Sequence, residues 1–135
     1  MILVDSSVWI DLLQSAHSTH GNHLSELIHQ AEPLGVPGPV IQEVLQGIRE
    51  EHSVGLVQKR LCCFPILHPD TETYVMAARL YRQLARHGTT VPPGDVTIAA
   101  LVIQRKHELY TLDRRHFERI KQHSELRLYQ PSSER

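Results

Sequence analysis

Residues 1–13 read MILVDSSVWIDLL, and this opening stretch decides the fold class. The aliphatic run Ile2–Val4 leads directly into Asp5. A short apolar run of this kind indicates a strand that is buried on both faces, as in a parallel sheet. A lone carboxylate is costly at the end of a buried strand. The rest of the chain therefore has to supply a reason for Asp5.

The composition is that of an ordinary globular chain. Its 135 residues are 41% hydrophobic and 21% charged, which predicts a single domain over residues 1–135. The chain opens without a positively charged segment and has no long apolar run. We therefore expect neither a signal peptide nor a contact with a membrane. The adjacent Cys62 and Cys63 are expected to be small, buried, reduced thiols of a cytoplasmic protein, because neighbouring cysteines rarely meet disulfide geometry.

Basic residues are distributed unevenly along the chain, although the net charge is only −1. Arg49, Lys59 and Arg60 precede Asp70, and the remaining basic residues follow it. Such an asymmetry can mark a surface that faces a polyanion. Ordinary solvated helix faces are the favoured interpretation when the asymmetry is taken alone.

Hydrophobic periodicity and turn residues predict alternating strands and helices. The predicted strands cover residues 2–4, 34–36, 63–67, 108–112 and 126–130. The predicted helices cover residues 7–13, 24–31, 39–50, 52–61, 71–87 and 95–103, with a shorter one over 114–120. Ser6 or Ser7 is expected to cap the first helix, and residues 15–23 are expected to form a polar loop. This order predicts an α/β fold with a central, mostly parallel sheet flanked by helices on both faces.

Four acidic residues occupy special places in this scheme. Asp5 and Asp113 follow predicted strands, and Asp95 lies at the start of a helix that is apolar nearly all round. In open α/β sheets ligands bind beyond the carboxyl ends of the strands, so these carboxylates are expected to meet there. Glu43 flanks the apolar stripe of its helix, one turn from Gly47, which would leave room for it. Taken singly, each aspartate could be a cap or turn residue and Glu43 a boundary residue in water.

Clustered carboxylates raise an electrostatic problem that a cation solves. Two like charges ~4 Å apart repel by roughly 4 kcal/mol at an effective dielectric constant near 20. Four of them would take up protons or separate unless a cation lay among them. Mg²⁺ and Mn²⁺ prefer carboxylate and water oxygens. One or two such ions held by acidic residues are the usual apparatus for attack on a phosphodiester.

Three motifs resemble those of the PIN-domain ribonucleases, and among them the VapC-like toxins of toxin–antitoxin pairs. The motifs are LVDSSVWID (3–11), VIQEVLQGI (40–48) and GDVTIAALVIQRKHELYTLDRRHFERI (94–120). The resemblance implies a PIN-like fold and a metal site made of Asp5, Glu43, Asp95 and Asp113, with Asp5 and Asp95 as direct ligands. It also implies that Ser6 and Thr111 supply hydroxyl groups beside the site.

The function that this resemblance implies is that of a Mg²⁺- or Mn²⁺-dependent endoribonuclease. It would act as a toxin on structured RNA such as tRNA or rRNA, form a homodimer, and be neutralised by a small antitoxin. Arg114, with Arg115 and Arg119, is a candidate phosphate contact or part of a solvated helix face. Two alternatives stay open, a related nuclease acting on DNA and a receiver-like phospho-signalling module. A receiver-like module would need a lysine at a strand end, and the sequence places none there.

Several histidine and aromatic residues have ambiguous roles. His17, His20 and His23 repeat at a spacing of three, which would bind Zn²⁺ or Ni²⁺ on a firm helix, but a mobile polar loop is favoured. His116 lies near Asp113, where a surface or packing role is favoured over proton transfer. Trp9 and Phe117 are expected to be core or interface anchors rather than platforms for bases.

Overall fold

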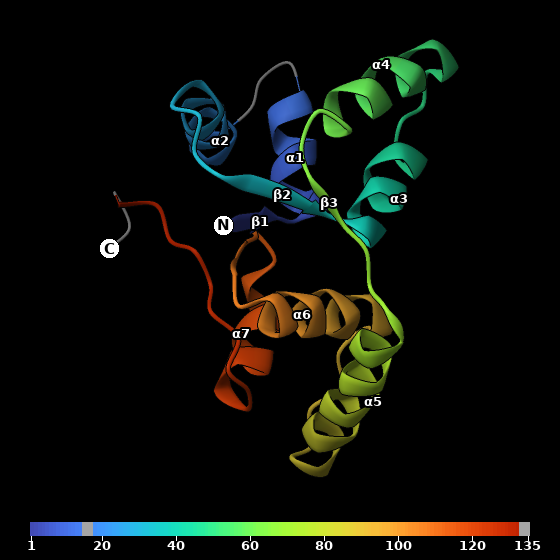
Figure 1. The fold of residues 1–135 in the computed structure, drawn as a ribbon, viewed down its shortest axis with the longest axis vertical. Helices are drawn as coiled ribbons and strands as arrows, with labels where there is room; N and C mark the ends of the chain where they lie inside the picture. The colour runs from blue at the N-terminus through green and yellow to red at the C-terminus, as the bar shows by residue number, and fades with distance from the viewer. Residues whose placement is uncertain (15–17, 133–135) are drawn as a thin grey trace.

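The computed structural model describes residues 1–14 and 18–132, which form a four-stranded sheet in the order β3–β2–β1–β4 (Figure 1). The strands are β1 (Ile2–Val4), β2 (Leu34–Pro37), β3 (Ile66–Leu67) and β4 (Glu108–Tyr110). All neighbouring strands pair in parallel. The predicted parallel sheet is therefore confirmed.

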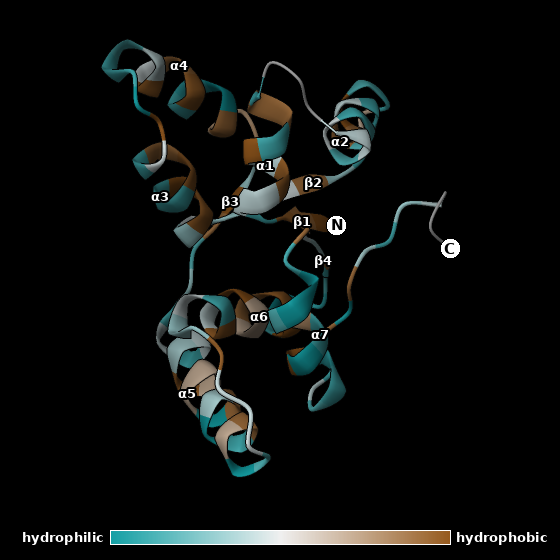
Figure 2. Ribbon diagram, turned by 180° about the vertical axis from the view of Figure 1, so that it is seen from behind, coloured by the Kyte–Doolittle hydropathy of each residue, from teal (hydrophilic) through white to brown (hydrophobic). Residues whose placement is uncertain are grey.

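Helices cover both faces of this sheet. They are α1 (Ser6–Leu13), α2 (Thr19–His29), α3 (Gly38–Gln46), α4 (Glu51–Leu61), α5 (Thr71–Arg86), α6 (Pro93–Arg105) and α7 (Arg114–Gln122). Helices α1 to α4 lie on one side of the strands and α5 to α7 on the other (Figure 1). Figure 2 shows hydrophobic residues along the strands and on the adjoining parts of the helices. The α/β architecture with two helical layers is as predicted.

Helix α6 is a buried part of the core, as its apolar sequence predicts. Its buried residues are Val96, Ile98, Ala99, Ala100, Leu101 and Val102. It packs against α5, α7 and β4. Within the described ranges, no helix is both long and apolar enough to cross a bilayer.

The central strand β1 is tightly enclosed. Leu3 and Val4 are fully buried, and Leu3 pairs with Gly35 of β2. A Cβ atom on Gly35 would lie 2.8 Å from Leu3 Cδ2 and 2.8 Å from Met1 Sδ, closer than side chains normally approach. Glycine at this position lets the side chain of Leu3 pack across its neighbour strand.

The ends of the long helix α5 follow the predicted signals. Asp70 accepts a hydrogen bond from the Thr73 backbone N–H (2.9 Å), and Thr73 Oγ1 accepts one from the Asp70 N–H (3.0 Å). This reciprocal pair is a capping box, which satisfies two backbone donors at the helix start. Gly88, with a φ of +73°, lies just past the helix end in the left-handed region that favours glycine.

Two helix starts differ from the prediction. Ser6 and Ser7 do not cap α1, because both lie inside the helix and Asp5 is its N-cap residue. The expected polar loop is also wrong over residues 19–23, where α2 has already begun. Asp11 explains this early start, since its carboxylate accepts hydrogen bonds from Ser18 and, at 2.8 Å, from the Gly21 N–H.

Two further expectations change in the structure. The predicted last strand is reduced to one isolated parallel bridge between Leu109 and Leu128, beside β4. The cysteines are free thiols, but Cys62 and Cys63 are exposed rather than buried. The preceding Leu61, only 2% exposed, is the residue that packs inward at the end of α4.

Truncation of a buried leucine in α6 should destabilise the protein strongly. Leu101 is fully buried, so Leu101→Ala removes packed atoms and leaves a cavity. We expect a loss of about 2–5 kcal/mol in the free energy of unfolding, measured by urea denaturation. Leu56, on α4, is 54% exposed and serves as the matched control, with an expected change within ~0.5 kcal/mol. Equal losses in the two variants would contradict the assignment of α6 to the core.

Candidate active site

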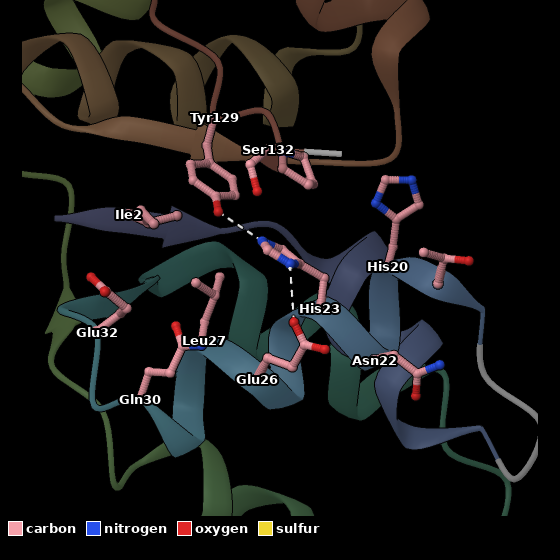
Figure 3. A pocket seen from close by; sticks show the side chains of 12 residues that line it. Ile2, His20, Asn22, His23, Glu26, Leu27, Gln30, Glu32, Tyr129 and Ser132 are labelled. Carbon is pink, nitrogen blue, oxygen red and sulfur yellow. Dashed lines mark hydrogen bonds and ion pairs between the residues drawn. The ribbon is translucent and has the colours of Figure 1, made fainter. Parts of the chain in front are cut away.

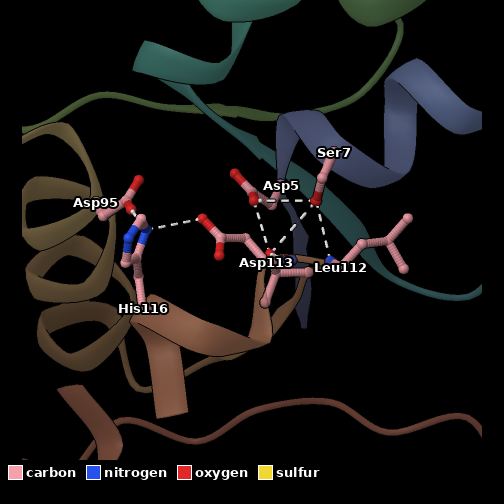
Figure 4. Close-up of polar contacts among 7 residues, drawn as sticks. Asp5, Ser7, Asp95, Leu112, Asp113 and His116 are labelled. Atoms are coloured by element: carbon pink, nitrogen blue, oxygen red, sulfur yellow. Dashed lines mark hydrogen bonds and ion pairs between the residues drawn. The ribbon is translucent and has the colours of Figure 1, made fainter. Parts of the chain in front are cut away.

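The four predicted acids come from four different elements that meet near the carboxyl ends of the strands. Asp5 follows β1 directly and Asp113 is the N-cap residue of α7, shortly after β4. Asp95 lies in the first turn of α6, and Glu43 lies on α3, the helix that follows β2. Figure 4 shows the side chains of Asp5, Asp95 and Asp113 turned toward a common region.

Asp5 is the most enclosed of these acids, with an exposed fraction of only 5%. Its Oδ2 accepts a hydrogen bond from Thr111 Oγ1 at 2.7 Å and another from Ser7 Oγ at 3.2 Å. These two hydroxyls orient the carboxylate, and a hydrogen bond from the Ser6 backbone also stabilises its charged form. Thr111 was predicted beside the site, whereas the role of Ser7 was missed.

Ser7 and Thr111 also hold the segment that carries Asp113. Ser7 Oγ accepts a hydrogen bond from the Leu112 N–H at 2.9 Å, and Thr111 Oγ1 accepts one from the Asp113 N–H at 2.9 Å. The same two hydroxyls therefore bind the carboxylate after β1 and the backbone after β4. This arrangement fixes Asp5 and Asp113 relative to each other.

His116 bridges two of the acids. Its Nδ1 lies 2.9 Å from Asp95 Oδ2 and 3.0 Å from Asp113 Oδ2 (Figure 4). The sequence placed His116 near Asp113, as the structure shows, but it did not predict the contact with Asp95. The i, i+3 spacing from Asp113 on a helix could have indicated that the two side chains share a face. The contact with Asp95 depends on tertiary packing and had no local signal.

Glu43 has a buried oxygen without a partner. Its Oε1 is the buried side-chain polar atom that, among the described residues, makes no hydrogen bond. A hydrogen bond with the Ser6 side chain opposes the rise in the pKa of Glu43, which places Ser6 beside this carboxyl. Gly47 does not make room for the carboxylate, because it is an exposed C-cap residue whose added Cβ would meet nothing closer than 3.6 Å.

Burial and mutual repulsion raise the pKa of three of these carboxyls. Burial is the main cause for Asp5, with a smaller contribution from the charge of Asp113 that hydrogen bonds from Thr111, Ser6 and Ser7 oppose. Burial and then the charges of Asp5 and Asp95 raise the pKa of Glu43. Burial and then the charges of Asp113 and Asp5 raise the pKa of Asp95, against the influence of His116. The four acids thus form one electrostatically coupled cluster.

These observations fit a divalent cation. A buried carboxylate oxygen without a partner is costly, and so is each added negative charge. A hard cation would satisfy the oxygen of Glu43 and relieve the repulsion. In the part of the chain that the structure describes, one group of three residues could hold a metal ion, because its donor atoms lie within 4.8 Å of one another. This group is Asp95, Asp113 and His116. Asp5 and Glu43 are coupled to this group electrostatically. The charge of Asp5 raises the pKa of Asp95, and the charge of Asp95 raises the pKa of Glu43.

The basic residues near Asp113 differ in their availability. Arg114 forms an ion pair with Glu118 on the same helix, with 3.0 Å between Nη1 and Oε1. Arg115 and Arg119 are exposed. They are better placed than Arg114 to meet a phosphate from solvent.

A pocket of about 700 Å³ lies away from the acids, between α2 and the C-terminal segment (Figure 3). His20 and His23 line it, and their rings are engaged by tyrosines. His20 Nδ1 lies 2.9 Å from Tyr110 OH, and His23 Nε2 lies 2.7 Å from Tyr129 OH. His17 lies outside the described residues. Neither described histidine belongs to a three-residue ligand group among those residues, so the zinc or nickel hypothesis has no support.

Trp9 and Phe117 are core residues, as predicted. Phe117 is fully buried and Trp9 is 4% exposed. Trp9 Nε1 donates a hydrogen bond to the Val4 carbonyl at 3.2 Å, and its ring packs against Phe64. Neither ring is available to stack on a base.

The resemblance implies an α/β fold with a parallel sheet and four acidic residues near the carboxyl ends of its strands, and the structure has this arrangement. Residues 2–122 match the PIN domain family, and the chain belongs to this family. Ribonuclease VapC1 from Methanocaldococcus jannaschii is 31% identical over 121 residues, which cover 90% of this chain and 82% of that protein. The resemblance to PIN-domain nucleases that the three motifs indicate is therefore confirmed.

Solved structures share the fold at low sequence identity. A toxin–antitoxin complex from Klebsiella pneumoniae contains a chain with a TM-score of 0.70 and 18% identity, covering 87% of this chain and 90% of that one. VapC20 from Mycobacterium tuberculosis, described as a Sarcin-Ricin loop cleaving toxin, has a TM-score of 0.67 and 17% identity. That match covers 87% of this chain and 94% of that one. At these identities the comparisons concern the fold.

Removal of the Glu43 charge should stabilise the metal-free protein at high pH. The pKa of Glu43 is raised in the folded state above its ordinary value of 4.5. The folded state therefore holds this proton more strongly than the unfolded state, and stability is lost as pH rises from 4.5 through the folded pKa. In EDTA at pH 8, Glu43→Gln should raise the melting temperature by roughly 2–5 °C, and the gain should vanish below about pH 4.

Thermal unfolding followed by circular dichroism across this pH range measures the effect. Glu125 is exposed and offers a matched control, since Glu125→Gln removes one carboxylate outside the acid cluster. A pH-independent gain for Glu43→Gln, or an equal gain for the control, would show that repulsion within the cluster is not the cause.

Proposed function

We propose that this protein is a divalent-metal-dependent endoribonuclease that acts as the toxin of a toxin–antitoxin pair. The observation that carries the proposal is the convergence of four coupled carboxylates, one with an orphaned buried oxygen, in a member of the PIN domain family. The site residues are Asp5, Glu43, Asp95 and Asp113. Mg²⁺ or Mn²⁺ is the ion that suits this oxygen-rich donor set.

The chain's own residues divide the work of hydrolysis. When bound, the ion would supply a polarised water and neutralise charge on the phosphate. Thr111 and Ser7 fix the orientation of Asp5, so that its carboxylate would be available to hold the ion without rearrangement. Asp95 and Asp113, whose carboxylate oxygens lie close together, would supply further oxygen ligands to the ion. Exposed Arg115 and Arg119 would attract and position the RNA backbone.

RNA is the favoured substrate because the similar VapC1 protein is named a ribonuclease and VapC20 is described as a toxin that cleaves the Sarcin-Ricin loop. We extend this to the chain as cleavage of a structured RNA such as tRNA or rRNA, where loops expose readable bases. The same site chemistry would serve a DNA nuclease, which stays the alternative. A receiver-like module is disfavoured by the family match and by the sequence, which puts no lysine at a strand end.

The proposal includes a partner and an assembly state. The structural similarity to the chain from the Klebsiella pneumoniae toxin–antitoxin complex supports a small antitoxin as the neutralising partner. We also propose that residues 1–135 form one domain and that the protein is a homodimer. A cytoplasmic location follows from an RNA substrate of this kind.

Replacement of Asp5 by asparagine should abolish cleavage without unfolding the protein. The change keeps the size of the side chain and its contacts with Thr111 and Ser7, but it removes a charge that the ion requires. We expect a loss of at least about 100-fold in cleavage of end-labelled structured RNA in the presence of Mg²⁺ or Mn²⁺. Chelation by EDTA should abolish cleavage by the unmodified protein.

A matched control is Asp70→Asn, the same chemical change at an exposed helix cap where asparagine is also a good cap. It should keep full activity. A single-stranded DNA of the same sequence tests the alternative substrate, and sequencing of RNA ends after brief expression locates the bond that is cut. Undiminished cleavage by purified Asp5→Asn protein would refute the site, and preferred cleavage of the DNA would refute the ribonuclease.

A further inference from the structure

His116 occupies a position that the acid cluster alone does not explain. Its Nδ1 lies within 3.0 Å of both Asp95 Oδ2 and Asp113 Oδ2, whereas its side chain is only 30% exposed. Figure 4 shows the ring between these two carboxylates, on the side away from Asp5. An imidazole nitrogen is itself a metal ligand as well as a hydrogen-bond donor.

The distances match those between neighbouring ligands of one ion. Ligands at right angles around an octahedral ion, with bonds of about 2.1 Å, lie about 3 Å apart. The separations of 2.9 Å and 3.0 Å from Nδ1 to the two carboxylate oxygens agree with this value. The three donor atoms therefore lie in positions that a single ion could share, with the ring proton carried on Nε2.

The fold restrains the ring in this place. Asp113 is the N-cap residue of α7, and His116 follows three residues later on the same face. The next residue, Phe117, is fully buried and anchors the helix against the core. Because the backbone of α7 is fixed in this way, His116 can remain beside Asp95 without the cost of ordering a mobile segment.

We propose that His116 is a ligand, through Nδ1, of the ion held by Asp95 and Asp113, and that it makes the site prefer Mn²⁺ to Mg²⁺. The inference rests on the proposed metal-dependent function. Mg²⁺ is satisfied by carboxylate and water oxygens, and an imidazole nitrogen adds affinity mainly for transition-metal ions. The remaining carboxylates suit Mn²⁺ among these ions. His116 thus sets which cation the site takes.

The competing role is that of a positioning residue, which would hold the two carboxylates together by an N–H donor. His116→Asn separates the two roles, because the asparagine amide keeps an N–H donor near the place of Nδ1 but has no imidazole nitrogen. His52, whose side chain is 83% exposed on α4, provides the matched control His52→Asn.

The experiment uses the full chain loaded with Mn²⁺ and detects the nitrogen ligand directly. Electron spin-echo spectroscopy should show nitrogen hyperfine coupling to Mn²⁺ in the unmodified protein and in His52→Asn, and none in His116→Asn. Titration with Mn²⁺ and with Mg²⁺ should show that His116→Asn lowers the affinity for Mn²⁺ about tenfold relative to the affinity for Mg²⁺. His52→Asn should leave that ratio unchanged.

Each failure has a distinct meaning. If the unmodified protein binds Mn²⁺ and cuts RNA but shows no nitrogen coupling, His116 is not a ligand and only this inference is overturned. The same holds if His116→Asn keeps the ratio of affinities, which would identify a positioning residue. If the unmodified protein binds neither ion, the proposed function fails and this inference fails with it.

Discussion

The whole site depends on repulsion between carboxylates that the fold holds close together. Asp5 is 5% exposed, and the charge of Asp113 adds a smaller amount to the cost of its burial. Hydrogen bonds from Thr111 and Ser7 offset part of this cost and keep the carboxylate in one orientation. The remaining cost is electrostatic repulsion, which a bound cation would relieve. The unfavourable state of the metal-free site would therefore be the source of the affinity that we propose for a divalent ion.

The parallel sheet explains how segments far apart in the sequence supply these groups. Strands β1 and β4 are neighbours and end at the same edge, so residues after position 4 and after position 110 meet there. Helix α6 contributes Asp95 at its start and the centre of the core along its length. The core and the proposed active site thus share one helix, and a substitution that shifts α6 would displace Asp95 as well.

Much of the fold and part of the candidate site could be predicted from the sequence, because these features depend on local patterns. The alternation of apolar strands and helices predicts the fold. The apolar run before Asp5 and the largely apolar helix after Asp95 indicate two of the candidate acids. Other features depend on contacts across the fold. The early start of α2 requires the carboxylate of Asp11, and the bridge from His116 to Asp95 requires α7 to pack beside α6. Cys62 is exposed because the preceding Leu61 already packs into the core at the end of α4.

The two outer strands of the sheet have a consequence for self-association. Strand β3 has only two residues and is soon followed by Pro69, which has no N–H to donate. Beyond β4, the chain around Leu128 already takes up the backbone groups of Leu109. In the described residues, neither margin leaves a long row of open backbone groups for a foreign strand. The sheet is thereby protected from edge-to-edge aggregation, and partners are left to bind through side chains and helices.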